Sequence, residues 1–138
     1  MKLIKPLLIA VLLTKPALAA DLSASTYLGL QQAEIKANYK CAPTFLALGG
    51  GRRMICRGND SGVFTFILQG RKSVVVEITP NQPELTLIEA LQHLESQCEA
   101  NKDTIAFTCE ANVQGSAEET QFGVTITLCE ERYCPDLG

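Results

Sequence analysis

Residues 63–79 read VFTFILQGRKSVVVEIT, and this stretch holds the two strongest strand signals in the chain. It contains two runs rich in β-branched and aromatic residues, 63–69 and 72–79, and this composition is typical of strands. Gly70 and Arg71 stand between the runs, and glycine suits the first central position of a type II′ turn. The pattern therefore predicts an antiparallel hairpin.

The segment before this hairpin predicts a second pair of strands. Residues 44–48 and 52–57 are separated by three glycines at positions 49–51, which permit the positive φ angles of a tight reversal. Residues 21–40 show neither a clean helical period nor a clean strand period. We interpret them as a short helix or an irregular lead-in.

The C-terminal half predicts one helix followed by a last hairpin. Within residues 83–98, Leu87, Leu91, Leu94 and Cys98 recur at helical spacing and form one apolar stripe. Residues 104–113 and 122–128 alternate apolar and polar side chains, so they are expected to pair as strands, with the turn inside the polar stretch 114–121.

The order of these elements predicts an α+β domain. We expect an antiparallel sheet of about five to six strands, with one main helix packed on it and disulfides as staples. The sequence shows no internal repeat.

The N-terminus has the pattern of a secretory signal peptide. Two lysines, an apolar run over 6–13 and the small residues Ala17 and Ala19 follow one another within residues 1–20. The apolar run is shorter than the ~20 residues that span a bilayer, so no stable membrane anchor is expected. The prediction is a single secreted or extracellular domain over residues 21–138, periplasmic if the source is bacterial.

All six cysteines follow the predicted cleavage site, and an even number in a small exported chain predicts three disulfides. One is expected to join Cys41 to Cys56 across the glycine turn. If the strand 104–113 runs back along the helix, Cys109 lies roughly 16 Å from Cys98, beyond disulfide reach. Cys98 is therefore expected to pair with Cys129 or Cys134.

No metal site or cofactor is predicted. A zinc site needs close cysteine pairs together with histidine, whereas the closest cysteines here are Cys129 and Cys134 and the chain has one histidine.

Charge is distributed unevenly along the chain. Loss of the three lysines before residue 20 would leave nine basic residues against fifteen acidic ones, a net charge of −6, which argues against a general nucleic-acid binder. Residues 22–76 hold seven basic and two acidic residues, and residues 77–138 hold two and twelve. Either the two halves attract each other within the fold or a basic face binds an acidic partner. The candidates for that face are Arg52, Arg53, Arg57, Arg71 and Lys72.

No catalytic constellation is visible. His93 falls on the helix side opposite Leu87 and Leu91, so it is expected to face solvent, and no nucleophile elbow accompanies it. The acidic pairs 118–119 and 130–131 are interpreted as solvated turn residues. Asn59 begins an Asn-Asp-Ser sequon and is a glycosylation candidate in a eukaryotic source.

The helix ending at Cys98, the strand through Cys109 and the strand 123–129 followed by Cys134 resemble one family. They are similar to the ending of fungal killer-toxin-like secreted proteins of the smut-virus type. The resemblance covers about half of the mature chain. It implies growth inhibition of competing cells or plants through a membrane-channel target.

Residues 39–41, Tyr-Lys-Cys, are similar to a short motif in two other groups. Mildew effectors built on a ribonuclease-like scaffold carry Tyr-x-Cys, and bacterial periplasmic lysozyme inhibitors carry an aromatic-x-Cys.

Three functions follow as hypotheses. The first is a non-enzymatic secreted effector or toxin-like protein that binds a protein or cell-surface target of a host or competitor. The second is a periplasmic inhibitor or binding protein, for example of a hydrolase. The third is a small secreted ribonuclease-like hydrolase that uses His93 with Glu77 or Arg71.

Overall fold

The computed structural model describes residues 24–46, 51–58, 62–82, 84–100, 106–110 and 112–134. The predicted signal peptide, the glycines at 49 and 50 and the glycosylation candidate Asn59 lie outside these residues. Along the chain the elements are α2 (Ala24–Tyr27), α3 (Gln32–Asn38), β1 (Lys40–Cys41), β2 (Phe45–Leu46), β3 (Arg52–Gly58), β4 (Gly62–Gln69), β5 (Lys72–Thr79), α4 (Leu87–Gln97), β6 (Glu99–Ala100), β7 (Phe107–Glu110), β8 (Val113–Thr120), β9 (Gly123–Glu130) and the 3-10 turn η1 (Glu131–Tyr133).

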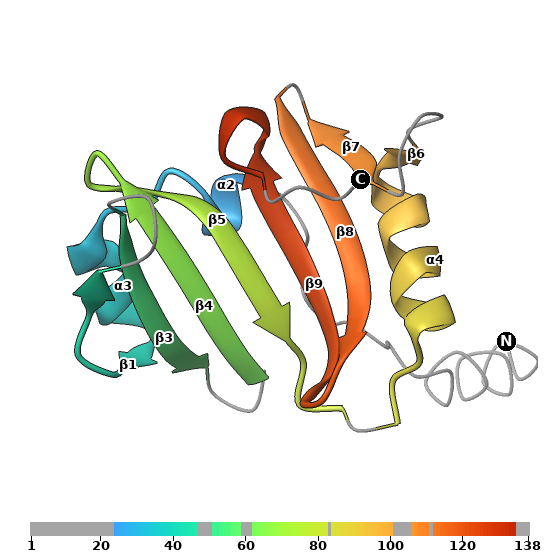
Figure 1. Cartoon of the computed structure of the whole chain (residues 1–138), viewed down its shortest axis with the longest axis horizontal. Coiled ribbons are helices and arrows are strands. Elements are labelled where there is room, and N and C mark those ends of the chain that lie inside the picture. Colours follow the sequence, from blue (N-terminus) through green and yellow to red (C-terminus); the bar gives the residue numbers. More distant parts are fainter. Residues whose placement is uncertain are drawn as a thin grey trace, which may run out of the picture.

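One antiparallel sheet organises the described residues (Figure 1). Its strands follow the order β1-β3-β4-β5-β9-β8-β7-β6, and β2 pairs additionally with β3. The α+β class and the antiparallel sheet are confirmed. The expected size was wrong, because eight strands follow one another in this order and three α-helices accompany them in the described part of the chain.

The hairpin predicted for residues 63–79 is confirmed as β4 and β5. Its turn differs from the prediction, since both Gly70 (φ 57°) and Arg71 (φ 73°) have positive φ angles. Positive φ at both central positions is the type I′ turn, whose twist also matches that of the flanking strands. A bulge places Ile67 opposite Val75 and Leu68 opposite Ser73.

The predicted last hairpin was wrong, because 104–113 and 122–128 were expected to pair around a turn inside 114–121, whereas β8 lies between β7 and β9. Most of the stretch 114–121 forms β8, and the chain reverses at Gln121 and Phe122, between β8 and β9. β8 pairs Gly115 with Leu128 and Ala117 with Ile126, so small residues form its core side. A hydrophobicity pattern misses such a strand because its buried side chains are small.

All six cysteines form disulfides, which join Cys41 to Cys56, Cys98 to Cys109 and Cys129 to Cys134. The Cys41–Cys56 pairing is confirmed. The expected pairing of Cys98 with Cys129 or Cys134 was wrong.

The error lies in the path of the chain after α4. Cys98 is already extended (φ −133°, ψ 163°), and the chain continues as β6, which pairs Glu99 with Thr108. Cys98 therefore lies beside Cys109 in the ladder, with Cα atoms 4.2 Å apart. The strand returns against β6 and not along the helix, so the 16 Å expectation does not apply.

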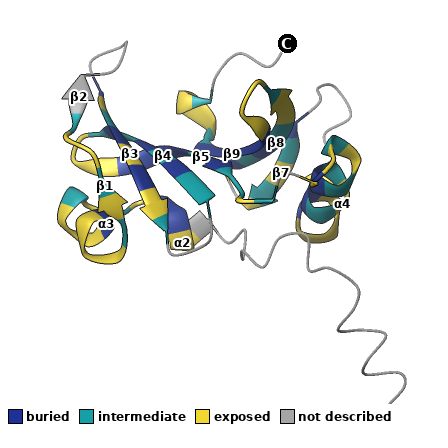
Figure 2. Cartoon of the chain, turned by 90° about the horizontal axis from the view of Figure 1, so that it is seen from below, coloured by how far each residue is buried: buried dark blue, intermediate teal, exposed yellow. Residues whose placement is uncertain are grey.

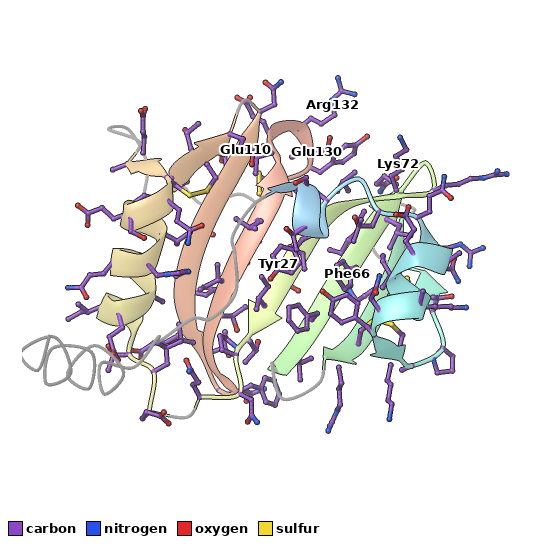
Figure 3. All side chains as sticks on the ribbon, turned by 180° about the vertical axis from the view of Figure 1, so that it is seen from behind. Tyr27, Phe66, Lys72, Glu110, Glu130 and Arg132 are labelled. Carbon is purple, nitrogen blue, oxygen red and sulfur yellow. A yellow bond between two sulfur atoms is a disulfide. The ribbon has the colours of Figure 1, made fainter. Side chains whose placement is uncertain are left out.

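The helices α2, α3 and α4 lie on the same side of the sheet (Figure 2). Ile35 of α3 and Leu94 of α4 are fully buried against strand residues such as Met54, Phe66 and Ile126. Figure 3 shows Tyr27 and Phe66 on this helix side. The apolar stripe of α4 is shifted from the prediction, because Ala90, Leu94 and Cys98 are its buried residues and Leu91 is half-buried.

The strand order shows a repeat that the sequence does not. Each half runs from a helix through a two-residue edge strand into a meander: α3-β1-β3-β4-β5 and then α4-β6-β7-β8-β9. The halves meet where β5 pairs with β9. Counted inward from either edge of the sheet, the strands of each half therefore follow one another in chain order. In each half, a disulfide ties the end of the helix or the edge strand to the next long strand. The molecule is thus a twofold-like arrangement of two similar units.

Candidate functional site

The sheet face opposite the helices carries the candidate site, and we call it the open face. In β3, Met54 and Cys56 are buried in the core beneath the helices, so Arg53, Ile55 and Arg57 lie on the open face. The same alternation places polar and aliphatic residues of the other long strands there, namely Val63, Thr65, Ile67, Glu77, Thr79, Thr125, Thr127, Ser116 and Glu118.

The strand registers arrange these side chains in rows across the sheet. One row runs from β3 to β8 through Ile55, Thr65, Glu77, Thr127 and Ser116. The next row runs through Arg57, Val63, Thr79, Thr125 and Glu118, and the hydroxyls of Thr79 and Thr125 are hydrogen-bonded at 2.9 Å. Adjacent strands are ~4.8 Å apart, so each row spans roughly 19 Å of sheet.

The second row and the β3–β5 part of the first row line a groove of about 970 Å³ at one end of the open face, whereas Thr127 and Ser116 are buried and do not line it. Thr65, Glu77, Thr79 and Thr125 are among its lining residues. The walls include Arg57 on β3 and Glu118 on β8. The turn between β8 and β9 adds Phe122 to the rim, where it is 79% exposed.

The charged groups of the groove are unpaired. Glu77 is half-buried, while Arg57 and Glu118 are exposed. Among the described residues, none of these three side chains has an ion-pair or hydrogen-bond partner. The Glu77 carboxylate has no such partner among the described residues and is therefore available to pair with an incoming cation.

The other end of the open face is covered by the chain itself. The turn η1 leads to Cys134, whose disulfide with Cys129 holds this segment against a small cluster of Ile67, Val74 and Val75. The chain's own turn therefore covers part of this end and leaves a smaller pocket, of about 570 Å³, beside it.

The five predicted basic candidates do not form one face. Arg53 and Arg57 lie on the open face, but only Arg57 lines the groove. Arg52 and Arg71 line a separate pocket of about 530 Å³ beside α3, and Lys72 lines a third, of about 570 Å³, near Glu130 and Arg132 (Figure 3). Within the described residues none of the five has an ion-pair partner, so no ion pair there joins the basic half to the acidic half through them.

The residues of the ribonuclease-like hypothesis are not brought together. The imidazole of His93 lies 3.2 Å from the side-chain amide of Gln97 on α4. Glu77 lies on the open face, across the sheet from α4, and Arg71 lies in the turn between β4 and β5. Over the described ranges, no group of three or more His, Cys, Asp or Glu residues is placed to hold a metal ion.

Sequence reasoning missed most of the groove. It treated Glu118 as a turn residue and did not single out Thr65, Thr79, Thr125 or Phe122. A signal was present, because threonines recur at alternate positions opposite the apolar side of the predicted strands. Which strands lie side by side, and so which threonines share a surface, follows only from the sheet order.

In the part of the chain that the structure describes, no helix combines the length and apolar character needed to cross a membrane. Comparisons with protein-family models, with curated proteins and with solved structures found no match.

Proposed function

We propose that this chain is an exported, non-enzymatic binding protein. It acts as an effector or inhibitor by binding a loop of a partner protein in the open-face groove. The observation that carries this proposal is the unpaired Glu77 carboxylate on the groove lining, with the exposed Phe122 on its rim. Hydrolysis is not part of the proposal, because His93 lies on α4, across the sheet from Glu77.

A rigid frame favours this use of the groove. Its lining comes from strands of one continuous sheet, and the disulfide between Cys41 and Cys56 fixes β3, which forms one wall. A surface that is ordered before binding loses less conformational entropy when a partner docks. Exposed aromatic side chains are frequent anchors of protein interfaces, which suits the position of Phe122.

Export is supported by the signal-peptide pattern and by the three disulfides, since disulfides persist in oxidising compartments. An extracellular effector and a periplasmic inhibitor would use the same surface, and the source of the partner separates them. The likeness to killer-toxin-like proteins stays a prediction.

A display selection tests the proposal. The chain is expressed from its full sequence, purified with its disulfides formed, and used to select from a library of disulfide-constrained peptide loops. We expect the enriched loops to bind the wild-type protein and to lose binding to Thr65→Arg, which fills the groove, and to Phe122→Ala, which removes the rim aromatic. Gln92→Arg adds the same charge on the exposed side of α4 and is the matched control.

Each variant is first checked for wild-type melting temperature. If the enriched loops bind Thr65→Arg and Phe122→Ala as well as they bind the wild type, the groove is not the binding surface and the proposal is wrong.

A further inference from the structure

The twofold-like arrangement relates the two ends of the open face to each other. The groove at one end can therefore be compared with the opposite end. The groove lies between the turn of the β8–β9 hairpin, with Phe122, and the adjacent ends of β3 and β4, at Gly58 and Gly62. The opposite end lies between the turn of the β4–β5 hairpin, with Gly70, and the connection from β7 to β8, with Asn112.

At that opposite end the chain covers its own sheet. After β9, residues 131–133 make a single 3-10 turn and Cys134 packs with Ile67, Val74 and Val75. The backbone nitrogen of Glu131 donates to the carbonyl oxygen of Asn112 at 2.7 Å, which fixes the turn to the neighbouring connection. The open face thus accepts one turn of polypeptide at this end.

The groove has no such cover among the described residues. After β5, Pro80 and Asn81 lie on the groove edge, and the next helix, α4, lies on the helix side of the sheet (Figure 2). No described residue occupies, at the groove end, the position that corresponds to η1.

The two ends differ in chemistry. At the covered end Cys134 packs on an apolar cluster, whereas the groove is lined by threonine hydroxyls and by Glu77, with Glu118 on one wall and Arg57 on the other. Neither carboxylate has a partner among the described residues, and the two lie two strands apart, roughly 10 Å across the sheet. Arg57 lies two strands from Glu77 on the other side, so its charge offsets that of Glu118, and the lining residues carry a net charge of −1 centred on Glu77, which favours a positive group there.

We propose that the partner inserts a single turn that carries a lysine or arginine, paired with Glu77, and an apolar side chain that contacts Phe122. This inference rests on the proposed function and specifies the chemistry of the partner. The hydroxyls of Thr65 and Thr125 then form hydrogen bonds with the backbone of the inserted turn. These bonds replace the hydrogen bonds to water that both sides lose when the partner docks.

The loops selected above provide the test. We expect them to be enriched in lysine or arginine, and we expect Glu77→Gln to weaken their binding about tenfold, as loss of a partly desolvated ion pair does. Glu95→Gln, on the exposed side of α4, is the matched control and is expected to leave the dissociation constant unchanged. Replacing the basic residue of a loop by methionine should produce the same loss, and no further loss in the Glu77→Gln protein.

The outcomes separate this inference from the proposed function. Loops that depend on Thr65 and Phe122 but carry no basic residue, and that bind Glu77→Gln normally, overturn the inference and leave the groove as a binding surface. A wild-type dimer in sedimentation velocity that becomes monomeric in Thr65→Arg also overturns it, because a second copy of the chain is then the occupant. Loops that bind Thr65→Arg and Phe122→Ala as tightly as the wild type overturn both this inference and the proposed function.

Discussion

Leu94 on α4 lies directly against Gly115 on β8. A Cβ atom built on Gly115 would lie 3.0 Å from Cδ2 of Leu94 and 2.8 Å from Sγ of Cys109. The absence of a side chain at this position therefore allows the helix and the Cys98–Cys109 disulfide to pack on β8.

Gly115→Ala is expected to destabilise the protein. The added methyl group forces α4 or the disulfide outward, and overpacking of this kind costs about 1–3 kcal/mol. Glu119→Ala, at an exposed position of the same strand, is the control and should change the free energy of unfolding by less than about 0.5 kcal/mol. Denaturant unfolding followed by circular dichroism measures both, and equal stabilities of the two variants would contradict the close approach.

Ser73 ties the N-terminal helices to β5. Its buried hydroxyl donates to the carbonyl oxygen of Tyr27 at 2.7 Å and accepts from the backbone nitrogen of Leu30 at 3.0 Å. Ser73→Ala leaves these groups without that partner and should cost about 1–3 kcal/mol. The exposed Thr108→Ala on β7 is the control. Hydrogen exchange should show faster exchange at residues 27–38 in the Ser73 variant alone, and an unchanged rate there would refute this role.

The disulfides are expected to contribute unequally. Cys41–Cys56 closes a loop of 15 residues and Cys129–Cys134 a loop of 5. In the chain-entropy model, replacing both cysteines by alanine costs about 3 kcal/mol for the longer loop and about 2 kcal/mol for the shorter one. Since small domains have about 5–15 kcal/mol in total, full reduction should abolish cooperative folding at physiological temperature.

Peptide mass spectrometry of the oxidised protein checks the pairing, and thermal melts with and without reductant check the stability. A reduced protein that melts within a few degrees of the oxidised one would show that the cysteines are not essential staples.

Tyr39 gives the protein a dependence on alkaline pH. Its ring packs against Phe64 and Phe66, with centroids 5.0 and 5.3 Å away, and burial raises the pKa of its hydroxyl above 10.0. The folded state therefore keeps this proton at pH values where the unfolded state has released it. Stability is independent of this group below the unfolded pKa and decreases as pH rises from about 10 through the folded value.

Tyr39→Phe should remove this contribution. Melting temperatures of the wild type and the variant, measured from pH 8 to pH 11, are expected to diverge above about pH 10, with the steeper fall in the wild type. Parallel curves would show that Tyr39 does not titrate differently in the two states.

The local pattern determined the long elements of this protein. Alternating and β-branched residues in 63–79 sufficed for the β4–β5 hairpin, and the apolar spacing after Thr86 sufficed for α4. The helix begins where Thr86 accepts from the backbone of Glu89 and the Glu89 carboxylate accepts from the backbone of Thr86. The formation of this hairpin and of this helix depends on residues only a few positions apart, so the sequence alone is enough to predict both elements.

Three features depend on residues far apart in the chain and follow only from the tertiary structure. β8 is a strand because Gly115 and Ala117 fit beneath α4, although its composition is that of a turn. Cys98 pairs with Cys109 because two residues after the helix join the sheet edge. The groove exists because β5 pairs with β9 and so brings Arg57, Glu77 and Glu118 to one surface. Side-chain periodicity shows which face of a strand is buried, but the neighbours of each strand follow from packing of the whole sheet, and the candidate site lies between those neighbours.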